Sequence, residues 1–225
     1  LHSTSRRQRQ MCIRDRQNAG FDLFLTANNH CLDRYTRGAI RTLHILDSIG
    51  ADHIGTYDSK DSFERFYPFI TSIKGIRIAF LNYTYGTNGF TPHSPLIVNY
   101  IDEEKIKKDI FRAKTLSADL IVACLHWGDE YQLLPNKRQE DLADFLAKEG
   151  VQLIIGAHPH VIQPMELRYD EQGNPCALIV YSLGNFISNM KTRDTVGGAM
   201  VKVVIRRDIT GKILLQSAQH TLVYT

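Results

Sequence analysis

Residues 151–160 read Val-Gln-Leu-Ile-Ile-Gly-Ala-His-Pro-His, an apolar run that ends in two histidines. Two other stretches share this pattern: residues 119–126 end in a histidine, and residues 21–30 end in Asn-Asn-His. Short apolar runs of this kind predict buried strands. In an open α/β sheet, ligands bind at the carboxyl ends of the strands. If the three runs are parallel neighbours, their polar ends meet at one edge.

The composition is that of an ordinary globular domain. Hydrophobic residues make up 43% and charged residues 23% of the 225 positions. The net charge of +3 comes from the first 17 residues, which hold five arginines and one acid, whereas the rest of the chain carries 22 basic and 23 acidic side chains. A nearly neutral domain without a basic patch gives no indication of a nucleic-acid partner.

Residues 1–17 differ from the rest of the sequence. They have little apolar content, no helical or strand period and no apolar core of a signal peptide. They resemble translated adaptor sequence, with a basic arm for anionic surfaces as the alternative. We therefore expect residues 1–17 to be a non-native or disordered tail, residues 18–225 to form a single domain, and the native N-terminus to be missing.

Hydrophobic periodicity after residue 18 predicts an α/β fold. The first two thirds alternate strands with helices, and the last third is mostly strand, which favours mixed sheets, or two packed sheets, with helices outside. The expected strands are 21–27, 69–73, 77–83, 119–125, 151–155, 161–169, 177–182, 200–207 and 212–224, and the expected helices are 36–49, 102–116 and 136–149.

The pair His158 and His160 is the first candidate for metal binding. Alternate side chains of an extended backbone point the same way, so both rings could reach one metal, or one each of a close pair. The alternative is two ordinary histidines in a turn. With His126 and Asn29 at equivalent strand ends, imidazoles and an amide oxygen favour a transition-metal site over a nucleophile–base triad.

The cluster of Asn28, Asn29 and His30 supplies the second candidate. Asn29 offers an oxygen ligand, whereas the neighbouring His30 faces the other way on an extended backbone and stays free as an acid or a hydrogen-bond donor. Asp33 could orient the His30 ring. The alternatives are that Asn28 and Asn29 form a turn and that Asp33 caps the following helix.

His126 begins the third cluster, which also contains Trp127 and Glu130. Trp127 is interpreted either as a packing residue or as a platform for the substrate. Glu130 is interpreted either as a partner of the ligands or as a solvated carboxylate.

Four blocks, residues 27–33, 125–131, 156–161 and 181–186, resemble the signature blocks of a known family. That family is the bacterial capsule-biosynthesis protein CapA family, also called the poly-γ-glutamate synthesis protein PgsA family, a branch of the calcineurin-like metallophosphoesterases. The resemblance runs from about residue 20 to about residue 205. It implies a metallophosphatase-like β-sandwich flanked by helices.

The resemblance also implies a role in capsule or poly-γ-glutamate biosynthesis or export. The expected substrate is an anionic polymer or a phosphoester, and the expected location is the cell envelope, at the extracellular face of the bacterial membrane. A membrane-bound capsule synthesis complex is the expected partner.

Individual roles follow from the same resemblance. Asn29 matches a metal ligand, with Asn28 in place of the usual glycine, and His30 matches the histidine that protonates the leaving group, supported by Asp33.

His126, His158 and His160 match the three histidine ligands of the family. Such sites hold two divalent transition-metal ions (Mn, Fe or Zn) about 3.5–4 Å apart. The role of Asn185 stays open between a site residue and a left-handed turn residue after Gly184.

One departure from the family pattern affects the expected activity. The family's first two metal-binding carboxylates precede the Asn-His block, and here only Asp22 precedes it outside the suspect tail. We therefore expect the opening strands of the fold, and half of the residues that bind the metals, to be missing. Two function classes stay open: a metal-dependent hydrolase, and a non-catalytic envelope component with a degenerate metal site.

Overall fold

A computed structural model describes residues 13–224 of the chain. Its centre is a six-stranded mixed sheet in the order β4-β5-β7-β8-β10-β9. The four inner strands are parallel, and the two edge strands each run antiparallel to their neighbour. The strands are β4 (Phe69–Ile73), β5 (Ile76–Thr84), β7 (Leu120–His126), β8 (Leu153–Ala157), β9 (Met165–Tyr169) and β10 (Pro175–Val180).

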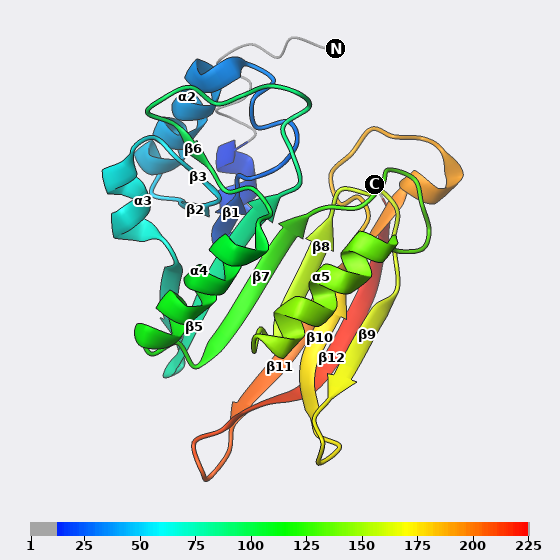
Figure 1. Cartoon of the computed structure of the whole chain (residues 1–225). Helices are drawn as coiled ribbons and strands as arrows, with labels where there is room; N and C mark the ends of the chain where they lie inside the picture. The colour runs from blue at the N-terminus through cyan, green and yellow to red at the C-terminus, as the bar shows by residue number, and fades with distance from the viewer. Residues whose placement is uncertain (1–12, 225) are drawn as a thin grey trace.

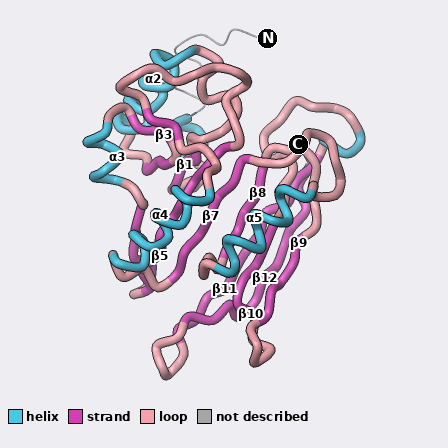
Figure 2. The backbone as a smooth tube through the Cα atoms, viewed as in Figure 1, coloured by secondary structure: helices cyan, strands magenta, loops and turns pink. Residues whose placement is uncertain are grey.

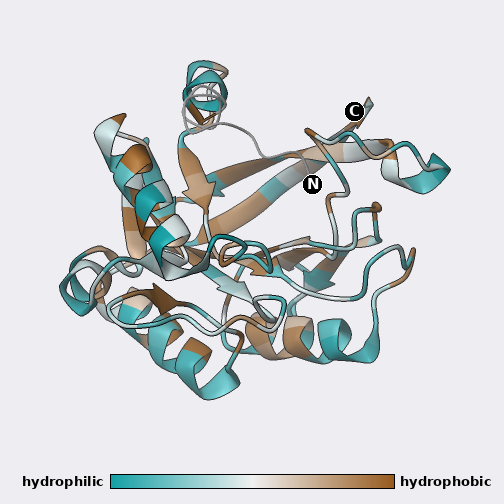
Figure 3. Cartoon of the chain, turned by 90° about the horizontal axis from the view of Figure 1, so that it is seen from above, coloured by the Kyte–Doolittle hydropathy of each residue, from teal (hydrophilic) through white to brown (hydrophobic). Residues whose placement is uncertain are grey.

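Helices α4 (Glu103–Thr115) and α5 (Lys137–Lys148) cover one face of this sheet (Figure 1). Each helix begins at a residue whose side chain accepts a backbone N–H of the first turn, Asp102 for α4 and Asn136 for α5. The helices carry hydrophobic residues on one side and hydrophilic residues on the other (Figure 3). The apolar sides pack on β5, β7, β8 and β10 to form the largest core cluster.

The hairpin of β11 (Gly197–Arg207) and β12 (Ile213–Tyr224) covers the opposite face. Apolar residues of the hairpin, among them Val203 and Ile213, pack against Val122 and Leu178 of the central sheet. The central strands are therefore buried on both faces, which explains why residues 119–126 are almost wholly apolar. Two packed sheets with helices outside confirm the predicted fold class.

A smaller N-terminal part lies beside β5. Strand β1 (Leu23–Leu25) runs parallel to β2 (Asp52–Ile54), and α2 (Tyr35–Ser48) connects them. Strand β3 (Thr56–Tyr57) pairs with β6 (Ile97–Val98), and the helix α3 (Lys60–Phe66) follows β3. The 3-10 turn η1 (Arg193–Thr195) lies between β10 and β11.

Asn82 joins the smaller part to the central sheet. Its Oδ1 accepts from the Ala27 backbone at 2.9 Å, and its Nδ2 donates to the Cys124 carbonyl at 3.0 Å. Because Asn82 is buried, both ends of its amide need these partners. The end of β1 is thereby held beside the ends of β5 and β7.

Some predicted boundaries were wrong. Strand β9 starts only at Met165, because residues 158–162 turn instead of extending. The short strands β2 and β3 and the helix α3 were not predicted, since elements of two to seven residues are too short to show a period.

The predicted tail falls largely outside the described residues, which exclude 1–12. Residues 13–18 are helical, and the Gln17 amide donates to the Ile49 carbonyl at 3.1 Å. The end of this segment therefore contacts the fold, a contact that the sequence did not lead us to expect.

Candidate metal centre

The predicted ligands lie at the ends of β7 and β8 in the central sheet and in the loop after β1, which pairs with β2 in a separate two-stranded sheet and is not the neighbour of β7 that the sequence led us to expect (Figure 2). His126 is the last residue of β7 and pairs in register with Ala157, the last residue of β8. The chain then passes directly into His158. The parallel register therefore explains why the histidines at the ends of two separate apolar runs lie next to each other.

The four predicted ligands come together as a continuous chain of contacts. His126 Nε2 lies 2.8 Å from Asn29 Oδ1. The ring centroids of His126 and His158 are 4.8 Å apart, and those of His158 and His160 are 6.1 Å apart. The predicted convergence at one edge is thus observed, while the roles of these residues as ligands stay predictions.

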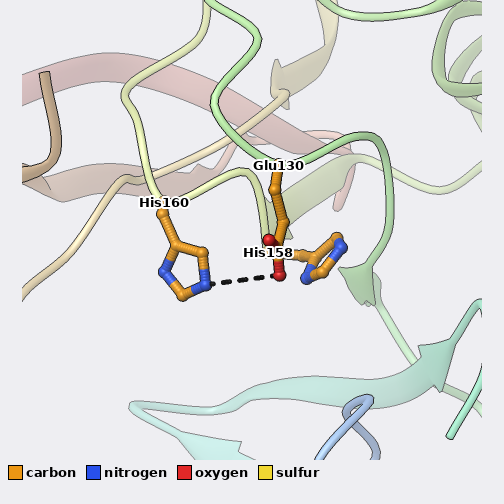
Figure 4. A group of neighbouring side chains, drawn as sticks. All are labelled: Glu130, His158 and His160. Carbon is orange, nitrogen blue, oxygen red and sulfur yellow. Dashed lines mark ion pairs between the residues drawn. The ribbon is translucent and has the colours of Figure 1, made fainter. Parts of the chain in front are cut away.

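Glu130 joins this group from the loop after β7. Ligand atoms of Glu130, His158 and His160 all lie within 4.8 Å of one another (Figure 4). His160 Nε2 lies 4.0 Å from Glu130 Oε1. The sequence suggested a partner of the ligands or a solvated carboxylate, whereas the geometry places Glu130 among the candidate ligands themselves.

The backbone at the two histidines is not extended. His158 has a φ of 107° and His160 a φ of 62°, both in the left-handed region. The predicted extended stretch is therefore wrong, although the two rings still face a common centre. Non-glycine residues in this region are strained and occur preferentially at functional sites.

Gly156 allows the close packing beneath this turn. A Cβ at this position would collide with the Tyr181 carbonyl oxygen and with the indole nitrogen of Trp127. Trp127 is only 2% exposed, and its Nε1 donates to that same carbonyl at 2.9 Å. This burial agrees with the packing alternative for Trp127.

His30 and Asp33 form the expected pair, with 2.9 Å between His30 Nδ1 and Asp33 Oδ2. Helix α2 begins after Arg34 and has no side-chain cap, so the capping alternative for Asp33 is wrong. Asn28 accepts from the His30 backbone N–H through Oδ1 and donates to the Thr26 carbonyl. Asn28 therefore shapes the turn that presents His30, in agreement with the turn alternative.

Asn185 orients the His160 ring. Its Oδ1 lies 3.0 Å from His160 Nδ1, and its Nδ2 donates to the Thr195 carbonyl at 2.9 Å. The amide oxygen can only accept, so His160 carries its proton on Nδ1 and leaves Nε2 free toward Glu130. The left-handed residue in this turn is Gly184, with a φ of 70°, and the turn alternative for Asn185 is wrong.

The electrostatics favour neutral histidines. Burial, reinforced by the neighbouring His158, His160 and His30, lowers the pKa of His126 to about 3. Burial also lowers the pKa of His158. Metal binding requires deprotonated imidazoles, so these two rings are ready to act as ligands at neutral pH.

An incomplete hydrogen-bond pattern gives independent evidence that the centre fits a metal. The Nδ1 of His158 is buried and has no hydrogen-bond partner within residues 13–224. Buried polar atoms are nearly always paired, so an unpaired imidazole nitrogen among four other candidate ligands is consistent with a position for an ion. Imidazole, carboxylate and amide oxygen together suit Mn, Fe or Zn.

Three residues beside the candidate ligands were not predicted from the sequence. Tyr85 and Asn88 lie in the loop after β5, and Tyr131 lies in the loop after β7. The Tyr85 ring stacks on His126 at 6.4 Å and lies 4.7 Å from the His158 ring. Tyr131 stacks on His160 at 6.0 Å, and Asn88 contacts both Asn29 and His30. Tyr85 directly follows the end of β5, so the strand-end rule that found the histidines could have found it.

A cavity of about 600 Å³ adjoins the centre between α4 and α5. Tyr85, Trp127 and Asp129 line the side nearest the histidines, and Glu103 and Arg138 line the side formed by the helices. The centre therefore opens onto a space large enough for a small substrate or for part of a polymer.

Solved structures with a similar arrangement of elements show the fold class. The chain resembles the Haemophilus influenzae NAD nucleotidase NadN with a TM-score of 0.62 at 12% identity, over 96% of this chain and 42% of that one. It resembles the Thermus thermophilus sulfate thiohydrolase SoxB with a TM-score of 0.58 at 16% identity, over 97% and 35%. The fold is that of the metallophosphoesterases.

The sequence comparisons identify the family. The model of the bacterial capsule synthesis protein family, PGA_cap, matches residues 4–190. The capsule biosynthesis protein CapA of Bacillus anthracis is 30% identical over 216 residues, which span 92% of this chain and 49% of the relative. The PGA biosynthesis protein CapA of Bacillus subtilis (strain 168) is 30% identical over 213 residues, which span 87% and 50%. The chain belongs to this bacterial capsule synthesis protein family.

The chain spans about half the length of these two relatives. Within the described residues, none of the helices combines the length and the apolar character needed to cross a membrane.

Proposed function

We propose that this protein, at full length, is a metal-dependent hydrolase of the phosphoesterase type that acts in the synthesis or export of an anionic capsule polymer. The observation that carries the proposal is the convergence of Asn29, His126, His158, His160 and Glu130 at one edge of the sheet. The buried, unpaired Nδ1 of His158 supports it, because that atom lacks any partner that the described fold supplies.

The five converging residues would hold the metal, and two ions are proposed for the full-length protein. When bound, divalent ions such as Mn²⁺, Fe²⁺ or Zn²⁺ supply polarisation of an ester oxygen and activation of water. Asn185 keeps Nε2 of His160 turned toward Glu130. The neighbouring strand ends thus hold nitrogen and oxygen donors in fixed positions before any substrate enters.

His30 is proposed as the acid that protonates the leaving group. Its side chain is 58% exposed, so a substrate can reach it, and Asp33 accepts from Nδ1 at 2.9 Å. Since a carboxylate can only accept, Nδ1 keeps its proton and Nε2 is the atom that gives a proton away.

The names of the relatives support the biological part of the proposal. Both are capsule or PGA biosynthesis proteins, which makes an anionic polymer such as poly-γ-glutamate, or a phosphoester, the proposed substrate. The cell envelope, at the outer face of the membrane, is the proposed location, and a membrane-bound capsule synthesis complex is the proposed partner.

The alternative is a non-catalytic envelope component with a degenerate metal site. One observation favours it: among residues 13–224, the cluster of candidate ligands contains a single carboxylate, Glu130. A site with few carboxylates offers less charge to hold two divalent ions.

The experiment compares metal content and turnover in the full-length protein loaded with Mn²⁺. His158→Ala should lower both together, because it removes a ligand. His30→Ala should keep the metal content near wild type and lower the turnover of an activated phosphodiester by about 10²–10⁴-fold, the usual contribution of a general acid. His220→Ala, at an exposed histidine on β12, is the matched control and should change neither.

Equal metal loss in the two active-site variants would overturn the role given to His30. Full metal binding by the wild type without turnover of any phosphoester would favour the non-catalytic alternative. Failure of the wild type to bind Mn²⁺, Fe²⁺ or Zn²⁺ would overturn the hydrolase proposal and leave the non-catalytic alternative.

A further inference from the structure

The turn of residues 84–90, which follows β5, is closely held by its own hydrogen bonds. The Phe90 N–H donates to the Thr87 carbonyl at 3.0 Å, and the Thr87 hydroxyl contacts both the Phe90 carbonyl and the Tyr100 hydroxyl. Asn88, at the tip, has a φ of 51°, a left-handed conformation that asparagine tolerates better than most residues. The Asn88 side chain therefore leaves a well-defined turn in a fixed direction.

That side chain contacts Asn29 at the candidate metal centre. Asn88 Oδ1 accepts from Asn29 Nδ2 at 3.2 Å, across 59 positions of sequence. At the other end of the same amide, Asn29 Oδ1 lies 2.8 Å from His126 Nε2. Asn29 is only 3% exposed, so water has little access to complete its hydrogen bonds. The surrounding residues must therefore decide which end of the amide faces His126.

Tyr85, in the same turn, lies beside the candidate ligands, and its ring stacks on His126 with the ring centroids 6.4 Å apart. Both ends of the Asn29 amide therefore have a partner, Asn88 Oδ1 at the nitrogen and His126 Nε2 at the oxygen. The acceptor at the nitrogen favours the orientation in which Oδ1 points away from the turn and toward His126.

The orientation matters because the two ends of an asparagine amide are nearly equal in shape and opposite in chemistry. The oxygen can bind a cation, whereas the NH₂ group only donates hydrogen bonds and repels it. Rotation of the Asn29 amide by half a turn would place the NH₂ group against His126 and against any ion held there. An acceptor on the nitrogen side prevents this rotation.

We propose that Asn88 is a positioning residue of the metal centre, which selects the metal-binding orientation of Asn29 by accepting a hydrogen bond from Nδ2. Asn88 does not itself touch the ion. Its Nδ2 lies 3.4 Å from His30 Nδ1, so the same side chain also packs against the proposed acid. The inference depends on the proposed metal centre.

The test measures the affinity of the full-length protein for Mn²⁺ alone by isothermal titration calorimetry. Asn88→Ala should weaken Mn²⁺ binding by about 10–100-fold, the usual effect of losing a residue that orients a metal ligand. Asn88→Asp keeps an oxygen acceptor for Nδ2 and should restore an affinity at or above the wild-type value. Asn174→Ala is the matched control, because Asn174 also lies in a turn and also contacts a nearby side chain, Asp170.

A second pair of variants, made in an Asn29→Asp protein, distinguishes a loss of the Asn29 amide orientation from a general destabilisation of the fold. In an Asn29→Asp protein both ends of the side chain are oxygens, so no orientation has to be selected. Adding Asn88→Ala there should change the Mn²⁺ affinity by less than about threefold, a difference within the additivity expected for uncoupled sites. A residue that merely stabilised the fold would weaken binding equally in both backgrounds.

The outcomes distinguish this inference from the proposed function. If the wild type binds no Mn²⁺, the metal centre itself is wrong. If the wild type binds Mn²⁺ and Asn88→Ala binds it equally well, only the role of Asn88 is wrong. If Asn88→Ala loses thermal stability and affinity, and the loss of affinity persists in the Asn29→Asp background, Asn88 is a structural residue and the inference is overturned.

Discussion

Two buried polar clusters in this protein differ in how completely they are hydrogen-bonded. One is the candidate metal centre described above. The other lies under α4, where Tyr67, Tyr83, Asp109 and Lys105 meet on the helix-covered face of the sheet. Both clusters bury several groups that would otherwise bind water, and each must replace those lost interactions.

The cluster under α4 is complete within itself. The Tyr67 and Tyr83 hydroxyls are 2.6 Å apart, and Tyr83 donates to Asp109 Oδ2 at 2.8 Å. Lys105 donates to the same oxygen at 2.7 Å, and its ammonium lies 4.9 Å from the Tyr67 ring centre. Burial, with the nearby Asp109 charge, raises the pKa of both tyrosines, which therefore stay protonated and serve as donors.

The metal centre, in contrast, leaves His158 Nδ1 unpaired and places two residues in the left-handed region. A polar cluster that satisfies itself stabilises the fold and needs nothing from outside. A cluster that is strained and incomplete favours a bound ligand, which would supply the missing partner. The difference suggests a simple criterion: substitutions in the first cluster should change stability, and those in the second should change binding.

The largest expected effect tests the cluster under α4. Asp109→Ala removes the shared acceptor and leaves two tyrosine hydroxyls and the Lys105 ammonium without it, so the free energy of unfolding should fall by about 3–5 kcal/mol. Urea denaturation measures this loss. Mn²⁺ affinity of the folded fraction should stay unchanged, and a parallel loss of affinity would contradict the separation of the two clusters.

The next effect tests the metal centre. Asn185→Ala removes the acceptor of His160 Nδ1 and should weaken Mn²⁺ binding by about 10–100-fold, because the ring is no longer held in one orientation. Stability without metal should change by less than about 1 kcal/mol, since Asn185 is only half-buried. Calorimetric titration measures the Mn²⁺ affinity, and urea denaturation measures the stability. A large loss of stability with unchanged affinity would contradict the criterion.

The smallest effect concerns pH in the metal-free protein. The pKa of His126 is about 3 when folded against 6.5 as the ordinary value, so the unfolded state binds more protons between these two values. Stability is therefore full above pH 6.5 and falls as the pH decreases, by about 2 kcal/mol between pH 6.5 and 5. Urea denaturation in a chelator should show this slope, and His126→Gln should flatten it. An equally steep slope in the variant would exclude His126 as its cause.

Much of this arrangement was predictable from local sequence. The runs ending at His126 and His158 are continuous and apolar because central parallel strands are buried on both faces, and that signal gave the fold class and the strand-end histidines. The roles of Glu130 and Asn88 were not predictable. Both lie in loops fixed by distant contacts, such as the Tyr131 N–H that donates to the Pro159 carbonyl at 2.8 Å.

Some short elements near the N-terminus could not be predicted from the sequence, for a different reason. Strands β2 and β3 hold only three and two residues, so their apolar positions are too few to show an alternation, whereas β1 falls within the predicted strand 21–27. The left-handed turn at His158 was missed because the sequence around Pro159 suggested an extended backbone, whereas His158 has a φ of 107°.

The left-handed backbone at His158 and His160 affects which residues can replace these two histidines during evolution. Glycine adopts such angles without strain, so a lineage released from binding would relieve the backbone strain by replacing either histidine. Selection for stability alone would thus erase this pair over time. A survey of natural variants can use these two positions as a marker: chains that keep both histidines are expected to retain the ligand, and chains with glycine there are expected to have abandoned it.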